Sequence, residues 1–254
     1  MHNEFIDIHS HTLWDIDDGA RDLREAVSLC LCAEDCGTST LFLTPHLMYW
    51  SQSESLCDER DEKADRLEDA LLDSGVDLTL KKGFEIFCDD EIFDVKYFKP
   101  YTLNESRYIL IEFDFRKTTE SDVKSWCRYL SSFGLVPIIA HPERYGFVAN
   151  NVSCLDELSQ AGVLFQINAG SPVGMFGDNA MDISCKMLEA GYVDFVGSDA
   201  HGINGRDTDM ESLFEDYPYK VTQEDIKKIS TVNPLFIIED KNYTPKRIKY
   251  IKEL

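Results

Sequence analysis

Hydrophobic and polar positions alternate along the chain with two different periods. In residues 22–36 apolar side chains recur every third or fourth position, as Leu23, Ala26 and Val27 do, which is typical of a helix buried on one face. Other runs are short and almost wholly apolar, such as residues 108–112, which end in Glu112. Such a run is typical of a strand buried on both faces of a parallel sheet. The two patterns follow one another along the chain and predict an α/β protein with helices outside a parallel sheet.

The pattern predicts the elements in chain order. The predicted strands cover residues 5–8, 40–43, 77–80, 108–112, 135–140, 163–168 and 192–197. The predicted helices cover residues 22–36, 56–74, 91–97, 120–133, 155–160 and 181–190, and two more begin near Met210 and Val221. An apolar run at 235–238 and a basic tail at 246–252 follow, and we interpret the tail as a helical cap on the fold. We expect a single domain over residues 1–254, because α/β barrels of this length are ordinary.

Five of the six histidines stand where an apolar run gives way to a loop. His9 and His11 close the first run, and strand side chains two positions apart point the same way. His46, His141 and His201 each follow a later run. Histidines scattered over a surface would not all occupy that kind of position. We therefore interpret these five as metal ligands, since neutral imidazole suits zinc, iron and manganese.

Four carboxylates occupy matching positions. Glu85 and Glu112 end apolar runs, Asp199 follows another, and Asp18 closes the loop after His11. A carboxylate at the end of a buried strand must be paired, hydrogen-bonded or bound to a metal, because an isolated buried charge is prohibitively costly. The predicted metal ligands are His9, His11, Asp18, His46, Glu85, Glu112, His141, Asp199 and His201.

This set is too large for one tetrahedral zinc site with an open position and suits two or three divalent ions bridged by carboxylates. Such ions clamp the attacking and leaving oxygens of an in-line displacement, with a bridging hydroxide as the expected nucleophile. Ligands after nearly every strand also predict a closed barrel with its site at the carboxyl ends of the strands.

Two arginines follow predicted ligands. Arg144 comes shortly after His141, and Arg206 comes shortly after His201. Either one alone would be read as a surface salt bridge. Together, at these positions, they favour phosphate binding, because the guanidinium fork matches phosphate oxygens. Divalent ions and two arginines outweigh four carboxylates, so the sequence predicts a positive well that captures an anion.

Composition restricts the partners. The chain has 254 residues, is 43% hydrophobic, and carries 47 acidic against 25 basic side chains, a formal charge of −22. That charge argues against a nucleic-acid surface, which needs a basic patch, and against docking on anionic lipid. No apolar run is long enough to span a membrane, so we expect no membrane insertion. Association of several copies stays open.

The eight cysteines are even in number, which would permit disulfides. The first residues have neither the basic nor the apolar region of a secretory signal, so we expect reduced cysteines in a cytoplasmic protein. The cysteine-based phosphatase loop C-x5-R is also missing, because Cys154 is followed at the arginine position by Gln160. A phosphatase with this sequence is therefore expected to use metal ions.

The motifs HSHTLWDIDDGA, TPH, GFEI, LIEF, HPERY, QINAGSPVGMFG and SDAH occur in this order between about Ile6 and Arg206. In combination they resemble the protein-tyrosine phosphatases of the PHP superfamily found in bacterial capsule and exopolysaccharide loci. The resemblance implies a distorted, TIM-like (β/α)7 barrel and a trinuclear site, commonly of manganese or iron, with zinc and magnesium as alternatives. It also implies a substrate, the phosphorylated tyrosine-rich tail of a cognate bacterial tyrosine kinase.

The resemblance further implies an arrangement of ligands and phosphate-binding roles for Arg144 and Arg206. One metal would take His9, His11, Glu85 and Asp199, a second Glu85, Glu112 and His141, and a third Asp18, His46 and His201.

The leading hypothesis is a metal-dependent phosphotyrosine-protein phosphatase. A phenolate leaves with little acid assistance, since its pKa is near 10, which fits a sequence without an obvious general acid. Trp14, Tyr49 and Trp50 are candidates to stack on the substrate ring, although residues 47–50 read equally well as a hydrophobic plug. The alternatives are a PHP phosphoesterase for a small molecule such as histidinol phosphate or for nucleic-acid ends, and a non-enzymatic metal-binding or kinase-docking protein.

Overall fold

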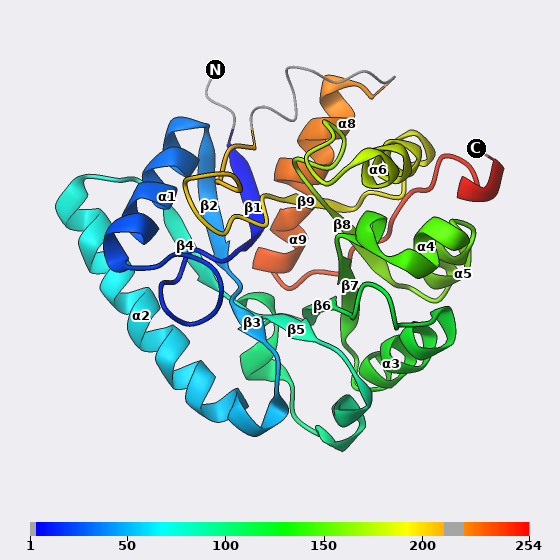
Figure 1. The fold of residues 1–254 in the computed structure, drawn as a ribbon, viewed down its shortest axis with the longest axis horizontal. Helices are drawn as coiled ribbons and strands as arrows, with labels where there is room; N and C mark the ends of the chain where they lie inside the picture. Colours follow the sequence, from blue (N-terminus) through cyan, green and yellow to red (C-terminus); the bar gives the residue numbers. More distant parts are fainter. Residues whose placement is uncertain (1–3, 211–220, 254) are drawn as a thin grey trace.

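The computed structural model describes residues 4–210 and 221–253 of the chain. Strands form the centre and helices the periphery, with α1 and α2 on one side and α3 to α6 on the other (Figure 1). Every hydrogen-bonded pair of neighbouring strands is parallel. The strands form two sheets, ordered β1-β2-β4 and β3-β5-β6-β7-β8-β9. The predicted α/β class with a parallel sheet is therefore confirmed.

The elements have the following bounds. The strands are β1 (Phe5–Ser10), β2 (Thr38–Leu43), β3 (His46–Leu47), β4 (Thr79–Lys82), β5 (Glu85–Phe87), β6 (Tyr108–Glu112), β7 (Val136–Ala140), β8 (Leu164–Asn168) and β9 (Phe195–Gly197). The α-helices are α1 (Leu23–Asp35), α2 (Ser53–Ser74), α3 (Glu120–Ser132), α4 (Gly146–Asn150), α5 (Cys154–Gln160), α6 (Asp178–Ala190), α8 (Gln223–Lys227) and α9 (Pro234–Ile238).

Local sequence signals set the ends of the long helices. The side chain of Asp22 accepts a hydrogen bond from the backbone N–H of Glu25 and caps α1. Thr119 and Asp122 form a reciprocal capping box at the start of α3. Gly75 ends α2 with φ of 73°, a conformation that favours glycine. These signals explain why the predicted and observed helices agree closely.

The strands are buried on both faces, so their side chains contribute alternately to an inner and an outer hydrophobic cluster. Alternate residues such as Ile8, Leu110 and Ile138 pack together on the inner side of the strands. Their neighbours, such as Ile111 and Ile139, belong to the larger cluster beneath the outer helices. Because the strands are parallel, their carboxyl ends lie at one side, where the functional residues emerge.

The segment around α9 covers the amino ends of the strands. Ile237 of α9 packs into the inner cluster. The hydroxyl of Tyr108, at the start of β6, donates to the carbonyl of Lys241 over 2.6 Å. Asn233 donates to the carbonyl of Asp194, just before β9, over 2.8 Å. This end of the molecule is closed by packing, so the opposite end is left for chemistry.

Two sequence expectations differ from the structure, one for the helix at 91–97 and one for the basic tail. The helix expected at 91–97 is a short 3-10 turn, Asp90–Asp94, capped by Asp89. The apolar run at 235–238 is part of α9, which begins at Pro234. The basic tail is not a helical cap, because only Ile251–Glu253 forms a helical turn there. Most of the helix expected from Met210 lies outside the described residues. Among the described residues, no helix is long and apolar enough to cross a membrane.

Candidate metal centre

The predicted ligands all emerge at the carboxyl side of the strands. His9 lies in β1 and His11 follows it, His46 begins β3, Glu85 begins β5, Glu112 ends β6, His141 follows β7, and Asp199 and His201 follow β9. Eight of these residues fall into three groups whose ligand atoms lie within 4.8 Å of one another, and His141 borders them. The structure thus brings together all nine residues selected from the sequence.

The first group joins His9, His11, Glu85 and Asp199, and all four are buried. The Nε2 atoms of His9 and His11 lie 3.2 Å apart. Each is also 3.2 Å from Oε2 of Glu85. Each is 3.5 Å from Oδ1 of Asp199. Four donor atoms therefore converge on one point.

Partners outside the group fix the orientation of both rings. Nδ1 of His9 donates to Oε1 of Gln166 over 3.0 Å, and Nδ1 of His11 donates to Oδ2 of Asp17 over 2.7 Å. Each neutral ring then presents the lone pair of Nε2 to the other. Two facing lone pairs repel unless a positive charge lies between them. The geometry therefore fits a cation, and Gln166 and Asp17 act as orienting partners of metal-binding imidazoles.

The electrostatics of the first group demand positive charge as well. Burial lowers the pKa of His11, but the carboxylates of Asp17 and Glu85 together outweigh burial and raise that pKa to about 9. Burial raises the pKa of Asp17, but its interactions with His11 and His46 together bring it down to about 2. The carboxylates of the centre favour a cation, either a proton or a metal ion.

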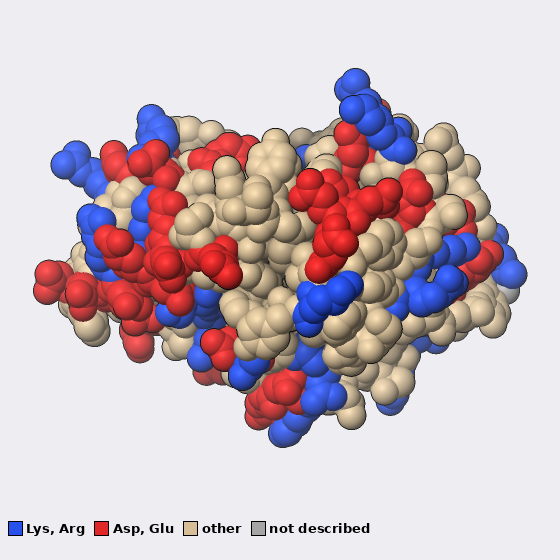
Figure 2. Space-filling model, turned by 90° about the horizontal axis from the view of Figure 1, so that it is seen from below, with Lys and Arg blue, Asp and Glu red and all other residues tan. Residues whose placement is uncertain are grey.

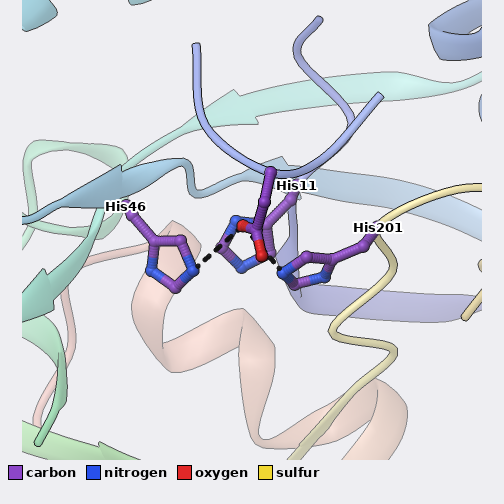
Figure 3. Close-up of side chains that lie close together, drawn as sticks. His11, His46 and His201 are labelled. Carbon is purple, nitrogen blue, oxygen red and sulfur yellow. Dashed lines mark ion pairs between the residues drawn. The ribbon is translucent and has the colours of Figure 1, made fainter. Parts of the chain in front are cut away.

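The second group joins His11, Asp18, His46 and His201. Nε2 of His46 lies 3.5 Å and Nε2 of His201 lies 3.4 Å from Oδ1 of Asp18. Figure 3 shows the three imidazole rings turned toward one another from separate parts of the chain, with these ion pairs dashed. Hydrogen bonds from His201 and His46 hold the pKa of the Asp18 carboxyl far below its usual range.

The third group joins His46, Glu85 and Glu112. Nδ1 of His46 lies 2.8 Å from Oε1 of Glu112 and 3.1 Å from Oε2 of Glu85. Nε2 of His141 lies 2.9 Å from the other carboxylate oxygen of Glu85. Glu85 thus faces two groups, as a bridging carboxylate would. The grouping differs in two respects from the arrangement implied by the resemblance. His11 joins Asp18, His46 and His201, and His46 stands in the group of Glu85 and Glu112, which His141 only borders.

Two site residues hold left-handed backbone conformations. His141 has φ of 35° and Asp199 has φ of 53°. Such conformations are uncommon for residues other than glycine and cluster at functional sites. His141 directly follows β7 and Asp199 lies two residues after β9, where the chain turns each side chain into the centre.

The two predicted arginines share one carboxylate. Nη1 of Arg144 lies 3.1 Å from Oδ2 of Asp199, and Nη2 of Arg206 lies 3.3 Å from Oδ1. The guanidinium of Arg144 lies 4.7 Å from the ring centres of both Phe115 and Phe176, and that of Arg206 lies 5.9 Å from Phe176. The aromatic rings orient the arginines without neutralising their charge.

Sequence reasoning missed the residues that orient the ligands. Asp17 and Gln166 hold the two first-group imidazoles, and the side-chain amide of Asn168 donates to Oδ2 of Asp199 over 2.6 Å. Glu143 is buried and accepts a hydrogen bond from the backbone N–H of Asn168. A signal was present in β8, because polar Gln166 and Asn168 interrupt an otherwise apolar strand that is fully buried.

The aromatic residues proposed as a stacking surface lie in different places. Trp14 is buried, with Arg66 above its ring at 5.0 Å. Trp50 packs against Phe98 and Tyr101. Only Tyr49 lines the groove beside the metal centre. The stacking hypothesis is therefore wrong for both tryptophans, because their large rings are used in packing.

The fold and the cluster of imidazoles and carboxylates define a metal-dependent hydrolase built on parallel strands. The chain belongs to the CpsB/CapC family of capsular polysaccharide synthesis, whose family model matches residues 5–239. The resemblance seen in the sequence motifs is thereby confirmed.

Several relatives cover most of the chain. CapC of Staphylococcus aureus is 34% identical over 223 residues, 87% of each chain. The tyrosine-protein phosphatase YwqE of Bacillus subtilis is 33% identical over 230 residues, covering 86% of this chain and 89% of YwqE. The tyrosine-protein phosphatase CpsB of Streptococcus pneumoniae is 29% identical, covering 92% and 98%.

Solved structures agree. One of the crystal structures of YwqE and CpsB, described as unique metal-dependent tyrosine phosphatases, matches with a TM-score of 0.82 and 29% identity, covering 96% of this chain and 99% of that chain. The phosphotriesterase homology protein of Escherichia coli matches with a TM-score of 0.54 at 10% identity, which shows a shared fold alone.

Proposed function

We propose that this protein is a metal-dependent phosphotyrosine-protein phosphatase. One observation carries the proposal: nine predicted ligand residues and two arginines, distant in sequence, converge at the carboxyl ends of parallel strands. The names of the relatives YwqE and CpsB, both tyrosine-protein phosphatases, support it. The resemblance points to a bacterial tyrosine kinase tail as the protein substrate and to capsule or exopolysaccharide synthesis as the process.

The three ligand groups would hold two or three divalent ions. Glu85 belongs to two groups and His46 to two, which suits ions that share ligands. The mixture of imidazole and carboxylate suits manganese, and iron, zinc or magnesium are the alternatives. Bound divalent ions would polarise the phosphate and activate water for an in-line displacement.

The remaining work is done by residues of the chain. Arg144 and Arg206 would bind phosphate oxygens, and Phe115 and Phe176 would hold Arg144 in place between two aromatic faces. The tyrosine oxygen leaves as a phenolate that needs little protonation, since its pKa is near 10. Cysteine is a poor candidate for the nucleophile, because burial raises the pKa of Cys30, Cys127 and Cys154 to about 12.

We also propose that the chain is one domain whose two sheets form a closed, distorted (β/α)7 barrel. The chain passes from β2 directly into β3 and from β4 into β5, so these four short strands count as two interrupted ones. The backbone N–H of Asp199 donates to the carbonyl of His9, and the backbone N–H of His11 donates to the carbonyl of Ala200, each over 2.8 Å. These two hydrogen bonds join the segment after β9 to β1. An experimental structure with an open edge there would contradict the barrel.

A cytoplasmic location is part of the proposal. Cys30, Cys88, Cys127 and Cys154 are buried free thiols. Proteins of an oxidising compartment tend to pair their cysteines, whereas a reducing compartment keeps thiols free. Fractionation of cells that produce the protein tests this, and recovery with the exported fraction would contradict it.

Hydrolysis of three phosphomonoesters tests the function. A phosphotyrosine peptide, para-nitrophenyl phosphate and histidinol phosphate are compared with added manganese and with chelator, for the wild type and His141→Ala. We expect manganese-dependent turnover of both aryl esters, lost in the variant. Metal content is measured in parallel, so that a variant with bound metal is distinguished from an empty one.

Turnover of histidinol phosphate alone would favour the small-molecule phosphoesterase. Absence of turnover from fully metal-loaded protein would favour a binding protein. Unchanged activity after complete metal removal would contradict a metal-dependent mechanism.

A further inference from the structure

A groove with a volume of ≈ 680 Å³ opens directly from the metal centre. Its inner end is formed by Asp18, His46 and Glu112, which all belong to the ligand groups. Its walls are mostly hydrophobic and come mainly from two segments, the chain after β3 and the chain after β6, with Ile16 and Phe87 added from the loop after β1 and from β5. The apolar residues of the two main walls are Met48, Tyr49, Leu56, Phe113 and Phe115. We call this space the aryl groove.

The two walls carry aromatic side chains that the fold leaves uncovered. Tyr49 is 58% exposed on one wall, and Phe115 is 36% exposed on the other. Phe115 also contacts Arg144, whose guanidinium lies 4.7 Å from the ring centre. A phosphate held by Arg144 therefore lies next to the groove, and the group esterified to that phosphate would extend along Phe115.

The aryl groove is lined by one arginine, Arg116, whose charge has no acidic partner among the described residues. Arg116 lines the groove, and its guanidinium forms no ion pair with any residue that the structure describes. Its neighbour Asp114 also lines the groove, but Oδ1 of Asp114 accepts hydrogen bonds from the backbone N–H groups of Arg116 and Lys117. The Asp114 carboxylate is thus engaged by its own loop, while the charge of Arg116 is left for a ligand.

We propose that the aryl groove binds the phosphotyrosine ring and the neighbouring residues of an acidic peptide, with Arg116 pairing with an acidic side chain beside the phosphotyrosine. This inference rests on the proposed phosphatase function and specifies its substrate class. The hydrophobic walls suit an aromatic ring better than a short polar alkyl group. An apolar groove with few placed polar groups is the usual form of a ligand site.

The net charge of the whole protein limits how strongly Arg116 can select acidic peptides. A chain with a formal charge of −22 repels acidic peptides at long range. At about 0.15 M ionic strength the screening length is about 8 Å, so contacts inside the groove outweigh distant charges. An exposed ion pair of this kind changes affinity by about two- to fivefold. Selection for acidic peptides is therefore expected to be modest and to weaken with added salt.

Matched peptides test the inference. Three peptides differ only in the residues flanking phosphotyrosine, which are glutamate, alanine or lysine, and kcat/KM is measured for the manganese-loaded protein. The wild type is expected to prefer glutamate over lysine about two- to fivefold. In Arg116→Glu the order should reverse. The control is Arg128→Glu, which makes the same charge change on the exposed face of α3 and should keep the wild-type order.

Binding is measured separately with the same peptides carrying a non-hydrolysable phosphonate. Fluorescence anisotropy then gives Kd, and Tyr49→Ala is expected to weaken binding of all three peptides, with recovery in Tyr49→Phe.

The outcomes separate the inference from the function on which it rests. The groove proposal would be overturned if the wild type hydrolysed the three peptides equally well, or if Arg116→Glu and Arg128→Glu changed the peptide preference equally. Either result would leave the phosphatase proposal intact. Failure of the wild type to hydrolyse any aryl phosphate would overturn the phosphatase proposal and the groove with it. If the preference for glutamate over lysine reverses in Arg116→Glu and not in Arg128→Glu, the groove is established as the peptide site.

Discussion

At the scale of single residues, the proposed metal centre depends on side chains outside the three ligand groups. Gln166 accepts the Nδ1 proton of His9, which leaves Nε2 free to bind. The amide group of Gln166 donates to Ile167 and Asn168, so its orientation is fixed. Removal of such a partner typically weakens metal affinity by about 10- to 100-fold, because the imidazole loses its tautomer and direction.

We therefore expect Gln166→Ala to bind manganese about 10- to 100-fold more weakly than the wild type. Competition with a chelator of known affinity measures the change. Gln160→Ala, at an exposed position at the end of α5, is the matched control and should bind like the wild type. Wild-type affinity in Gln166→Ala would mean that His9 is held by other contacts.

Phe176 offers a second residue-scale prediction. Its ring lies beneath both arginines, and an aromatic face attracts a cation whereas an aliphatic side chain does not. We expect Phe176→Leu to raise KM for aryl phosphates about two- to fivefold, in line with a loss of about 0.5–1 kcal/mol, while Phe176→Tyr retains the wild-type value.

Steady-state kinetics and inhibition by inorganic phosphate check this, since both report on binding of the phosphate group. If Phe176→Leu and Phe176→Tyr change KM equally, Phe176 acts through its shape alone.

Residue-scale prediction from sequence succeeded where position alone reveals chemistry. In the sequence, His46, Glu85 and His141 each close an apolar run, and that position identified them. In the structure His46 and Glu85 begin the short strands β3 and β5. Gln166 and Asp17 were missed because their role depends on which nitrogen of a distant ring they face. Trp14 and Trp50 were misjudged because an aromatic side chain near a ligand in sequence can pack into the core instead.

At the scale of elements, the long helices were predicted well because their caps and periodicity are local. The conformation of the basic tail was predicted wrongly, because it is set by partners that are distant in the sequence. The backbone N–H of Ile248 donates to the carbonyl of Ala190, and that of Ile251 donates to the Asp156 carboxylate. Neither partner can be inferred from the composition of residues 246–252.

Arg247 anchors this tail and provides the prediction at this scale. Its guanidinium contacts both carboxylate oxygens of Asp194 at 3.0 Å, and Asp194 is buried. Burial raises the pKa of Asp194, and the charge of Arg247 opposes that shift. Removing one partner of a buried ion pair leaves an uncompensated charge and costs about 3–5 kcal/mol.

We expect Arg247→Ala to lower the free energy of unfolding in urea by about 3–5 kcal/mol. Asp194→Asn added to that variant should restore part of the loss, because the unpaired charge is then gone. Lys246→Ala is the neighbouring exposed control and should stay close to the wild type. A small effect of Arg247→Ala would show that water reaches Asp194.

At the scale of the whole molecule, charge is distributed unevenly around a site that attracts cations. Figure 2 shows acidic side chains gathered toward the side of the molecule that holds α2. Helix α2 carries many exposed acidic residues, including Glu54, Glu62 and Asp65. The net charge of −22 therefore reflects mostly a solvated surface, as composition indicated, while the ligand carboxylates are a small share.

The arrangement of strands was also largely predictable, since alternation of helix and strand predicts a parallel sheet. The interruptions were not. Pro45 stands between β2 and β3, and Gly83 stands between β4 and β5. A Cβ atom at Gly83 would lie 2.7 Å from a side-chain carbon of Leu103, so this position requires glycine because of packing. Such a contact is set by tertiary structure.

The proposed metal centre takes its ligands from strands of both sheets, so metal binding and folding should be coupled. Its ligands come from β1, β3, β5 and β6 and from the segments after β7 and β9. An ion that binds the folded chain and not the unfolded one stabilises it by about 2.7 kcal/mol at a free concentration 100 times Kd. We expect chelator to lower Tm and added manganese to raise it progressively with concentration. Glu85→Gln, which weakens two ligand groups at once, should show a much smaller manganese-dependent shift. Equal shifts in the wild type and Glu85→Gln would mean that manganese acts at the acidic surface, and the proposed centre would then not be the site that ties the strands together.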